Sequence, residues 1–367
     1  MKNIVIYGGG FDPIHNGHIN MAINASKKLD AEVFFVPAHV SVWKEKTNVS
    51  DEDKVKMIEL AIKESENPRL HISLFEIESK EETNYSIDTV RYFKETYPDS
   101  KLYLLIGTDQ VNKFHKWKEC DELAELAQIV LFERPGFDLD QENLDRFNIN
   151  ILKGDLVDVS STDIRECRNL NVPYSVLKYI IDHELYFVPI IKSYMKEKRY
   201  LHSVSVANLA YEIAVENGFK DAWRYFLAGI LHDIGKDMPI IKQKEIVGTY
   251  FEDYLYFPTQ IIHQFVGRYL AEKDFDIQDR EILEAIEYHT TGHPDMGTLA
   301  KVIYASDKIE PTRGFDSSEY IKAMKVNAEE GFLVVLAANK QYFIDKQITY
   351  DNELTKATME KFLDNHI

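Results

Sequence analysis

Cysteine is nearly absent from this sequence of 367 residues, which contains only Cys120 and Cys167. Two cysteines cannot build a disulfide framework. Basic residues are also in the minority, with 43 Lys and Arg against 61 Asp and Glu and a formal net charge of -18. Nucleic-acid and anionic-membrane binders use basic surfaces, so neither partner is expected here. Any phosphate-bearing substrate must be bound by local cations, backbone amides or metal ions.

Long apolar runs are missing as well. No run approaches the ~18 residues of a membrane span, and residues 1–10 do not have the layout of a signal peptide. We therefore expect a cytoplasmic protein with no membrane partner. The composition, 45% hydrophobic and 28% charged, is typical of a soluble globular protein, and the length is sufficient for two domains. It says nothing about the oligomeric state.

The pattern of the sequence changes near residue 188. Before it, β-branched and aromatic runs alternate with helical stretches, which is typical of a parallel sheet with helices on both faces. After it, apolar residues recur at helical spacing and strand-like runs nearly vanish. We predict an α/β doubly wound parallel sheet in residues 1–187 and an all-α domain in residues 188–367. The predicted strands are residues 3–9, 32–38, 70–78, 101–109, 128–136 and 148–154.

The first specific motif is "GGGFDPIHNGH", residues 8–18. Glycines at the end of a buried strand let backbone N–H groups approach a phosphate. The following helix favours anions at its N-terminus. His15 and His18 are three residues apart, so at a helix start they can face the same point. We interpret the pair as an anion clamp for a triphosphate, because no third metal ligand lies nearby.

A second anion site is predicted at "VSSTDIRE", residues 159–166. Its serines and threonine offer a helix cap and free amides, and Arg165 follows one turn later. Asp109 ends another predicted strand, where it could accept a hydrogen bond from a ribose hydroxyl.

These segments together resemble the HxGH nucleotidyltransferase superfamily, and in particular the bacterial nicotinate-nucleotide adenylyltransferases. The likeness covers about residues 1–187 and includes "NYSIDTV" (84–90), "LIGTDQVNKFHKWKE" (105–119) and "FERPG" (132–136). It implies a Rossmann-like domain that transfers an adenylyl group from ATP, bound with Mg2+, to nicotinate mononucleotide. The implied catalytic residues are His15, His18, Lys44 and Arg165. The implied ATP-binding residues are Gly8, Gly9, Gly10, Phe11, Asp12, Gly107, Asp109, Arg134, Ser161 and Thr162, and the implied mononucleotide-binding residues are Tyr85, Thr89 and Trp117.

This sequence departs from the family pattern in three places. Gly10 replaces the usual Ser or Thr, "SVWK" (41–44) replaces "PPHK", and Lys54 stands where an Arg is expected. The acceptor could therefore be nicotinate mononucleotide, nicotinamide mononucleotide or another phosphate such as phosphopantetheine.

The second motif is "LHDIGK", residues 231–236, at the end of an apolar helix. A buried imidazole beside a carboxylate suits a divalent metal. The same half of the chain contains further candidate ligands. In order along the chain, they are His202, His263, His289 and Asp307.

The ordered set resembles the HD superfamily of metal-dependent phosphohydrolases, and in particular the bacterial group that hydrolyses diadenosine tetraphosphate (Ap4A) symmetrically. The likeness covers about residues 195–320. It implies an HD-type helical domain with two divalent metals, expected to be iron. One is held by His202, His232, Asp233 and Asp307, and the other by Asp233, His263 and His289. Asp233 is thus the implied catalytic bridge, while Lys236, Thr290 and Arg313 are implied substrate-binding residues.

The sequence therefore predicts a bifunctional enzyme whose partners are ATP, nicotinate mononucleotide and Ap4A. The HD domain could instead cleave another nucleotide, such as a guanosine tetraphosphate alarmone, or act as a non-catalytic nucleotide sensor. Residues after about 320 contain no motif, and their helical pattern predicts packing only.

Overall fold

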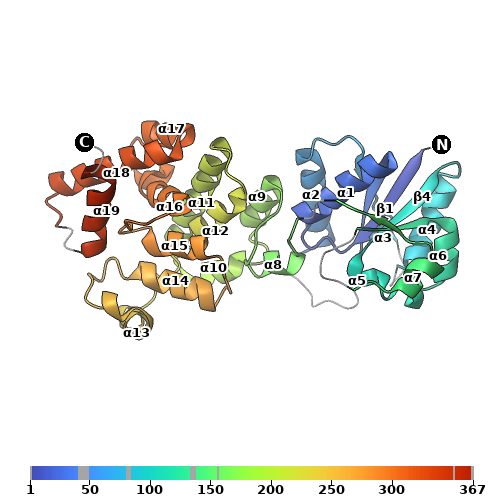
Figure 1. Ribbon diagram of the computed structural model, residues 1–367, viewed down its shortest axis with the longest axis horizontal. Coiled ribbons are helices and arrows are strands. Elements are labelled where there is room, and N and C mark those ends of the chain that lie inside the picture. Colours follow the sequence, from blue (N-terminus) through green and yellow to red (C-terminus); the bar gives the residue numbers. More distant parts are fainter. Residues whose placement is uncertain are drawn as a thin grey trace. The chain divides into compact units, whose positions relative to one another are not determined.

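The computed structural model describes residues 2–39, 49–79, 84–132, 138–154, 157–349 and 352–364. The chain divides into two compact units (Figure 1). The first unit comprises Met1–Arg165 and Asn171–Tyr186, and the second comprises Glu166–Leu170 and Phe187–Ile367. The chain thus enters the second unit briefly after Arg165 and returns before leaving the first unit for good.

The first unit is built on a six-stranded parallel sheet of order β3-β2-β1-β4-β5-β6. β1 and β4 are neighbours at the point where the strand order reverses, the place where ligands bind in doubly wound sheets. The predicted fold class is therefore confirmed. The strands are β1 (Asn3–Gly9), β2 (Ala31–Pro37), β3 (Leu70–Ile72), β4 (Lys101–Gly107), β5 (Gln128–Phe132) and β6 (Asn150–Leu152).

Helices cover both faces of this sheet (Figure 1). α1 and α2 pack on β1–β3, while α4 and α6 pack on the other face. Apolar side chains of β1, β4 and β5 form the core beneath the second group, because these central strands are buried on both faces. The helices are α1 (Asn16–Leu29), α2 (Asp51–Glu64), α3 (Phe75–Glu78), α4 (Ser86–Thr96), α5 (Thr108–Val111), η1 (Phe114–Lys116), α6 (Cys120–Leu126), α7 (Gln141–Arg146), α8 (Ser161–Arg165) and α9 (Tyr174–Asp182).

Two predicted strands run into helices in the structure. The predicted strand 101–109 ends at Gly107, because Thr108–Val111 form α5. The run 70–78 was expected to be strand throughout, but β3 ends at Ile72 and Phe75–Glu78 form a helical turn. The last sheet-side hydrogen bond runs from Ser73 N to Phe35 O at 2.9 Å. Beyond it the Phe75 ring stacks on Tyr92 of α4 at 4.3 Å, so tertiary packing overrides the local β propensity.

The second unit is helical throughout its described residues, as predicted (Figure 1). Its central helices pack on one another around an apolar interior. No helix among the described residues of the chain is long and apolar enough to cross a membrane. The helices are α10 (Val188–Tyr194), α11 (Glu197–Glu216), α12 (Ala222–Leu231), α13 (Ile240–Tyr250), η2 (Glu252–Tyr254), α14 (His263–Lys273), α15 (Arg280–Tyr288), α16 (Thr298–Ile309), η3 (Pro311–Arg313), α17 (Ser318–Val326), α18 (Ala328–Asp345) and α19 (Glu353–Leu363).

A glycine allows α11 and α12 to approach closely. A Cβ atom added to Gly229 would lie 2.6 Å from the Cα of Ala207 and 2.9 Å from its backbone nitrogen. Backbone atoms cannot give way as a flexible side chain can. This crossing also positions the end of α12, where His232 and Asp233 follow.

We expect Gly229→Ala to destabilise the second unit by ~1–3 kcal/mol, because the extra methyl group overpacks the helix crossing. Urea denaturation of the chain measures the change. Gly248→Ala in α13 is the matched control, since its Cβ would lie no closer than 3.6 Å to Leu255. That variant should gain about 0.5–1 kcal/mol from the better helix propensity of alanine. Equal stability of the two variants would contradict the packing argument.

Candidate functional sites

His15 and His18 cap the first turn of α1 together. The Nδ1 atom of His15 accepts a hydrogen bond from the backbone N–H of His18, and His18 Nδ1 accepts one from His15, both at 3.3 Å. The two rings stack with centroids 3.5 Å apart. Gly17 between them is required, because a Cβ there would lie 2.9 Å from His15 Nδ1.

This capping box determines the chemistry of the two rings. Because each Nδ1 atom accepts a hydrogen bond, the proton of each neutral imidazole resides on Nε2. Both rings are therefore Nε2–H donors beside the N-terminus of a helix, which is a favourable environment for a phosphate.

The second predicted anion segment lies against the first motif. Arg165 donates from Nη1 to the backbone oxygen of Asp12 at 2.6 Å and from Nη2 to the Thr162 hydroxyl at 3.0 Å. The Ser161 hydroxyl donates to the backbone oxygen of Pro13 at 3.0 Å. Ser160 caps α8, because its hydroxyl accepts from Asp163 N. Residues some 150 positions apart in the sequence thus form one loop cluster.

The glycine loop lies at the carboxyl ends of two neighbouring strands. Gly8 and Gly9 end β1, and Gly10 leads into Phe11, which has a positive φ of 43°. The buried Phe11 ring packs edge-on against His18, with centroids 5.0 Å apart. Gly107 ends the adjacent β4. Asp109 follows in α5, but its side chain is outside the described part of the structure. Lys44 and Arg134 are outside the described residues altogether.

The predicted mononucleotide-binding residues lie on and after α4. The Thr89 hydroxyl is buried and donates to the Glu76 carboxylate at 2.6 Å. The Tyr85 ring is 43% exposed, and the Lys118 ammonium lies 4.3 Å from its centroid. Trp117 is partly buried against Phe114. The described contacts of these residues do not reach the two histidines.

Two further side chains support this site. Sequence reasoning missed Tyr186 and named Lys54 only as a departure from the family pattern. The Tyr186 hydroxyl donates to the Asp12 carboxylate at 2.6 Å, and burial together with that carboxylate raises the pKa of Tyr186. Lys54 pairs with Asp51 at 2.5 Å and donates to the backbone oxygen of Ala38 at the end of β2. Lys54 therefore connects α2 to the residue that follows β2. No sequence signal marked Tyr186, because its partner Asp12 lies 174 residues earlier in the chain.

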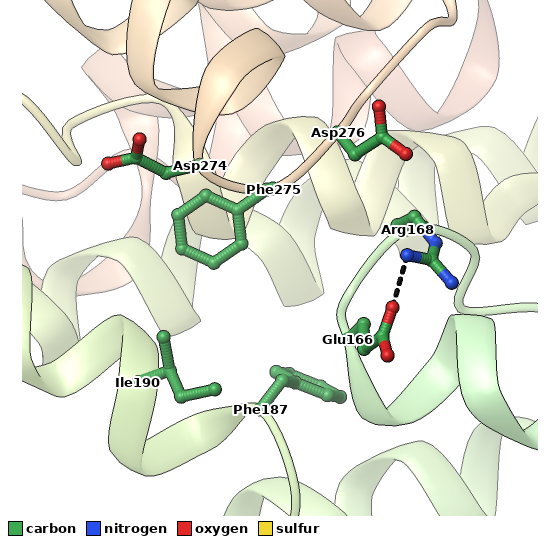
Figure 2. Close-up of a pocket in the computed structure, with 7 residues that line it drawn as sticks. All are labelled: Glu166, Arg168, Phe187, Ile190, Asp274, Phe275 and Asp276. Atoms are coloured by element: carbon green, nitrogen blue, oxygen red, sulfur yellow. Dashed lines mark ion pairs between the residues drawn. The ribbon is translucent and has the colours of Figure 1, made fainter.

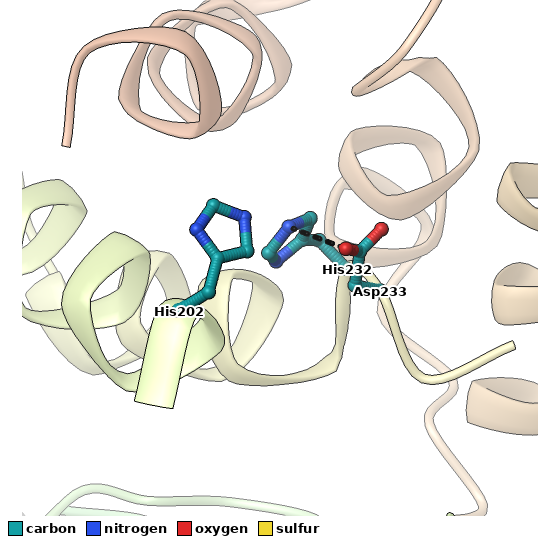
Figure 3. Close-up of side chains that lie close together, drawn as sticks. All are labelled: His202, His232 and Asp233. Atoms are coloured by element: carbon teal, nitrogen blue, oxygen red, sulfur yellow. Dashed lines mark ion pairs between the residues drawn. The ribbon is translucent and has the colours of Figure 1, made fainter. Parts of the chain in front are cut away.

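In the second unit, all six predicted metal ligands lie together. Potential ligand atoms of His202, His232 and Asp233 lie within 4.8 Å of one another, as do those of Asp233, His263 and His289. Asp233 belongs to both groups. Figure 3 shows His202 projecting toward His232 and Asp233 at the end of α12. Asp307 joins the first group, with its Oδ1 atom 3.1 Å from His202 Nε2 and 3.6 Å from His232 Nε2.

The tautomers of these imidazoles fit a metal. Nδ1 of His232 donates to the Gly229 backbone oxygen, and Nδ1 of His289 donates to that of Ile286, both at 2.7 Å. Each Nε2 atom is then an unprotonated acceptor. His232 Nε2 is buried without a hydrogen-bond partner among the described residues, and His289 Nε2 faces an Asp233 oxygen at 3.3 Å. Converging nitrogen lone pairs and carboxylates form a donor set that favours a divalent cation.

Burial and mutual contacts shift the pKa values of the cluster. Burial alone would raise the pKa of Asp233, but the imidazoles around it hold that pKa well below its usual range. Burial would likewise raise the pKa of Asp307, which Lys308 and His202 keep well below its usual range. Both carboxylates are therefore ionised at neutral pH, as metal binding requires.

Four cationic side chains surround these carboxylates. Lys236 lies 3.2 Å from Asp233, and Arg313 pairs with Asp307. Sequence reasoning named these two but missed Arg199, whose Nη1 lies 2.7 Å from Asp233, and Lys308, which lies 3.1 Å from Asp307. Arg199 precedes His202 by one turn on α11, and that spacing was the only available signal.

Thr290 lies at the metal-facing edge of the second group of ligands. Its hydroxyl is 2.9 Å from Nε2 of His289 and 3.3 Å from Nε2 of His263. The buried Gln264 side chain accepts from the backbone N–H groups of Thr290 and Thr291. Gln264 therefore fixes the turn after His289 to the start of α14.

A separate small cavity of about 210 Å³ lies elsewhere in the second unit (Figure 2). It contains none of the predicted site residues. Apolar rings and aliphatic carbon form part of its wall, and the Glu166–Arg168 ion pair closes one side. Its lining residues are Glu166, Arg168, Phe187, Ile190, Asp274, Phe275 and Asp276.

We expect the metal-free protein to lose stability as the pH falls below about 6.5. Burial lowers the pKa of His289 to about 3 and also lowers that of His263. The unfolded chain binds these protons below about pH 6.5 while the folded chain does not, so each ring costs up to ~1.4 kcal/mol per pH unit. The pKa of His202 is raised, since Asp307 and Glu310 outweigh burial. Its stabilising contribution is complete below pH 6.5 and does not change the slope.

Urea denaturation of the metal-free protein at a series of pH values measures this slope. Asp233 and Asp307 do not contribute in this range, because the unfolded carboxyls titrate near pH 3.9. His289→Asn removes one titrating ring and should flatten the slope. A slope unchanged by this substitution would contradict the assignment.

Comparison with known proteins finds a matching family model for each unit. The Cytidylyltransferase-like family model matches residues 6–167, and the HD domain model matches residues 199–312. A protein of Mycoplasma genitalium named a probable nicotinate-nucleotide adenylyltransferase/Ap4A hydrolase is 34% identical over 91% of this chain and 97% of its own length. A protein of the same name from Mycoplasma pneumoniae is 30% identical over 94% of this chain and 97% of its own.

Other proteins match only about half of this chain. A probable nicotinate-nucleotide adenylyltransferase of Aquifex aeolicus is 37% identical over 43% of this chain and 99% of its own length. A solved structure from Clostridium acetobutylicum, described as a predicted HD superfamily hydrolase involved in NAD metabolism, has a TM-score of 0.44 and 30% identity, covering 48% of this chain and 94% of that one. On the full-length matches to the Mycoplasma proteins, this chain belongs to their family, in which a cytidylyltransferase-like domain precedes an HD domain.

Proposed function

We propose that the chain is a bifunctional enzyme. Its first unit transfers the adenylyl group of ATP to nicotinate mononucleotide, giving nicotinate adenine dinucleotide and pyrophosphate. Its second unit hydrolyses Ap4A to two molecules of ADP. The observation that supports the first activity is the His15–His18 capping box beside Arg165, and the six converging ligands around Asp233 support the second. The names of the full-length relatives point to the same pair of activities.

In the first unit, a 5′-phosphate oxygen of nicotinate mononucleotide attacks the α-phosphorus of ATP. The new P–O bond forms as the bond from that phosphorus to the bridging oxygen breaks, and pyrophosphate leaves. The acceptor phosphate is already ionised, so no general base is needed. The chain holds the reactants in line and stabilises developing charge with the Nε2–H groups of His15 and His18 and with Arg165.

The remaining predicted residues of the first unit take binding roles. Gly8, Gly9 and Gly10 let the backbone approach the phosphates of ATP, which brings Mg2+ with it. Gly107 and Asp109 lie where the ribose is expected at the end of β4. The mononucleotide side comprises Tyr85, Thr89 and Trp117, and we assign Lys44 and Arg134 as further cations.

In the second unit, we assign one divalent cation to His202, His232, Asp233 and Asp307 and another to Asp233, His263 and His289. Such a pair, which we expect to be iron, supplies Lewis-acid activation of water and charge stabilisation at phosphate oxygens. Asp233 would be the ligand that both cations share. The polar groups that face the substrate are Thr290, Lys236, Arg313 and Arg199.

The hydrolysis itself adds water across the middle of Ap4A. The water oxygen bonds to one of the two inner phosphorus atoms, and the bond from that phosphorus to the central bridging oxygen breaks. Each product is ADP. The cations beside Asp233 and Asp307 are placed to neutralise the phosphate charge of this substrate.

Two free, buried cysteines agree with a reducing, cytoplasmic location.

We expect His18→Ala to slow adenylyl transfer by ~100-fold or more, as loss of one preorganised donor worth about 2.7–4 kcal/mol would do. Steady-state formation of nicotinate adenine dinucleotide measures the loss. Ap4A hydrolysis serves as the internal reference and should not change.

His18→Gln separates chemistry from folding. Gln is a normal residue at this position of a capping box, so the helix start should be retained while the imidazole donor is lost. This variant should be slow with an unchanged melting temperature. Turnover within a few-fold of wild type in both variants would rule out the role of His18 as phosphate donor.

We expect Asp233→Ala to abolish Ap4A hydrolysis and to lower the bound transition metal, because both cations lose their shared ligand. Nicotinate adenine dinucleotide synthesis should stay near wild type. Elemental analysis and both assays are made on one preparation. Iron is the metal expected in the wild type.

The exposed Asp253 provides the matched control, and Asp253→Ala should keep both activities and the metal. Undiminished hydrolysis by Asp233→Ala would refute the two-metal assignment. Loss of both activities in a folded protein would refute independent function of the two units.

A further inference from the structure

A buried carboxylate that belongs to neither ligand group faces His202. Glu310 follows the end of α16 and is 1% exposed. Its Oε1 atom lies 3.0 Å from Nδ1 of His202. The same carboxylate accepts from the backbone N–H and the hydroxyl of Thr312, each at 2.7 Å. Thr312 therefore holds the Glu310 carboxylate in place, and the Oε1 atom of that carboxylate also contacts the imidazole.

This partner distinguishes His202 from the other imidazoles of the cluster. Nδ1 of His232 and of His289 donates to a neutral backbone oxygen one turn earlier in the chain. Among the imidazoles of this cluster whose Nδ1 partner the structure describes, only His202 faces a carboxylate. A carboxylate partner fixes the ring orientation and raises the basicity of the opposite nitrogen, which is the atom that binds a metal. That nitrogen, Nε2, lies 3.1 Å from Asp307.

The two ligand groups also differ in the number of their carboxylates. The His202 group contains Asp233 and Asp307 and is backed by Glu310, whereas the His263 group contains only the shared Asp233. The nearby cations are divided evenly, because Arg199 and Lys236 contact Asp233 while Lys308 and Arg313 contact Asp307. Because Asp233 is shared, Lys308 and Arg313 offset the two additional carboxylates, and Arg313 also lies 3.9 Å from Glu310. The His202 group therefore differs from the other in its additional carboxylate ligand and in the carboxylate behind its imidazole.

We propose that Glu310 is a positioning residue that holds His202 with Nε2 toward the cation and makes the His202 group the tighter of the two metal subsites. The inference depends on the two-metal arrangement of the proposed function. It adds an order of affinity between the subsites and a residue that sets this order without touching the metal.

A structural role competes with this explanation. Glu310 is also the cap of η3, since it accepts from Thr312 N. A cap supports local folding and does not distinguish between the two subsites. The variants must therefore separate the contact with His202 from the contact with Thr312.

The experiment is a titration of metal-free, full-length protein with Co2+, followed by its visible absorption. Wild type should bind two ions in two steps of different affinity. Glu310→Gln should weaken the tighter step by ~10–100-fold, the usual effect of losing an outer partner of a ligating histidine. The weaker step should not change.

Three further variants locate the effect. Glu310→Asp keeps the charge and a good capping residue but withdraws the carboxylate from His202, so the tighter step should again weaken, with a normal melting temperature. Thr312→Val keeps the Glu310–His202 contact and should bind Co2+ as wild type does. In a His202→Ala background, Glu310→Gln should have no additional effect, because Glu310 acts through that ring.

Several results would overturn the inference. They are an unchanged tighter step in Glu310→Gln and Glu310→Asp, equal weakening of both steps, an effect of Thr312→Val as large as that of Glu310→Gln, or an effect that persists without His202. Wild type that binds fewer than two Co2+ ions would overturn the two-metal arrangement itself, and the inference with it. Wild type with two steps that Glu310 does not influence would overturn the inference alone.

Discussion

The contact made by the Nδ1 atom of each imidazole determines what both units can do. In the first unit, the Nδ1 atoms of His15 and His18 accept backbone N–H groups, so the rings present Nε2–H donors suited to phosphate oxygens. In the second unit, the Nδ1 atoms of His232 and His289 donate to backbone oxygens, so the rings present Nε2 lone pairs suited to a cation. The same side chain is thus suited to anions in one unit and to a metal cation in the other.

Backbone geometry sets these opposite tautomers. At the start of α1 the chain has unpaired N–H groups, which need acceptors. At the ends of α12 and α15 the last turns have unpaired carbonyl groups, which need donors, and the histidines that follow supply them. The close crossing of α11 and α12 at Gly229 then brings the first of these ends near His202. Helix ends and helix packing therefore place ring nitrogens where the chemistry requires them.

Much of this arrangement was predictable from the sequence. The alternation of strands and helices, the change near residue 188 and the order of the motifs predicted the fold class and the six side chains, Asp233 among them, that lie together in the second unit. The run 70–78 was misjudged, since packing of Phe75 on Tyr92 decides its conformation. Arg199, Glu310 and Tyr186 were missed because each acts through a partner distant in the sequence. Lys308 was missed although it directly follows Asp307, its partner.

The sequence by itself determined which chemical groups are available and in what order they occur along the chain. It placed His15 and His18 one turn apart and set His232 beside Asp233 at the end of an apolar helix. Only the tertiary structure decided which Nδ1 partner the described rings have, and that the partner of His202 is the Glu310 carboxylate and not a backbone oxygen. The physical reason is that tautomer, burial and pKa depend on atoms within a few ångströms, and packing alone brings those atoms together.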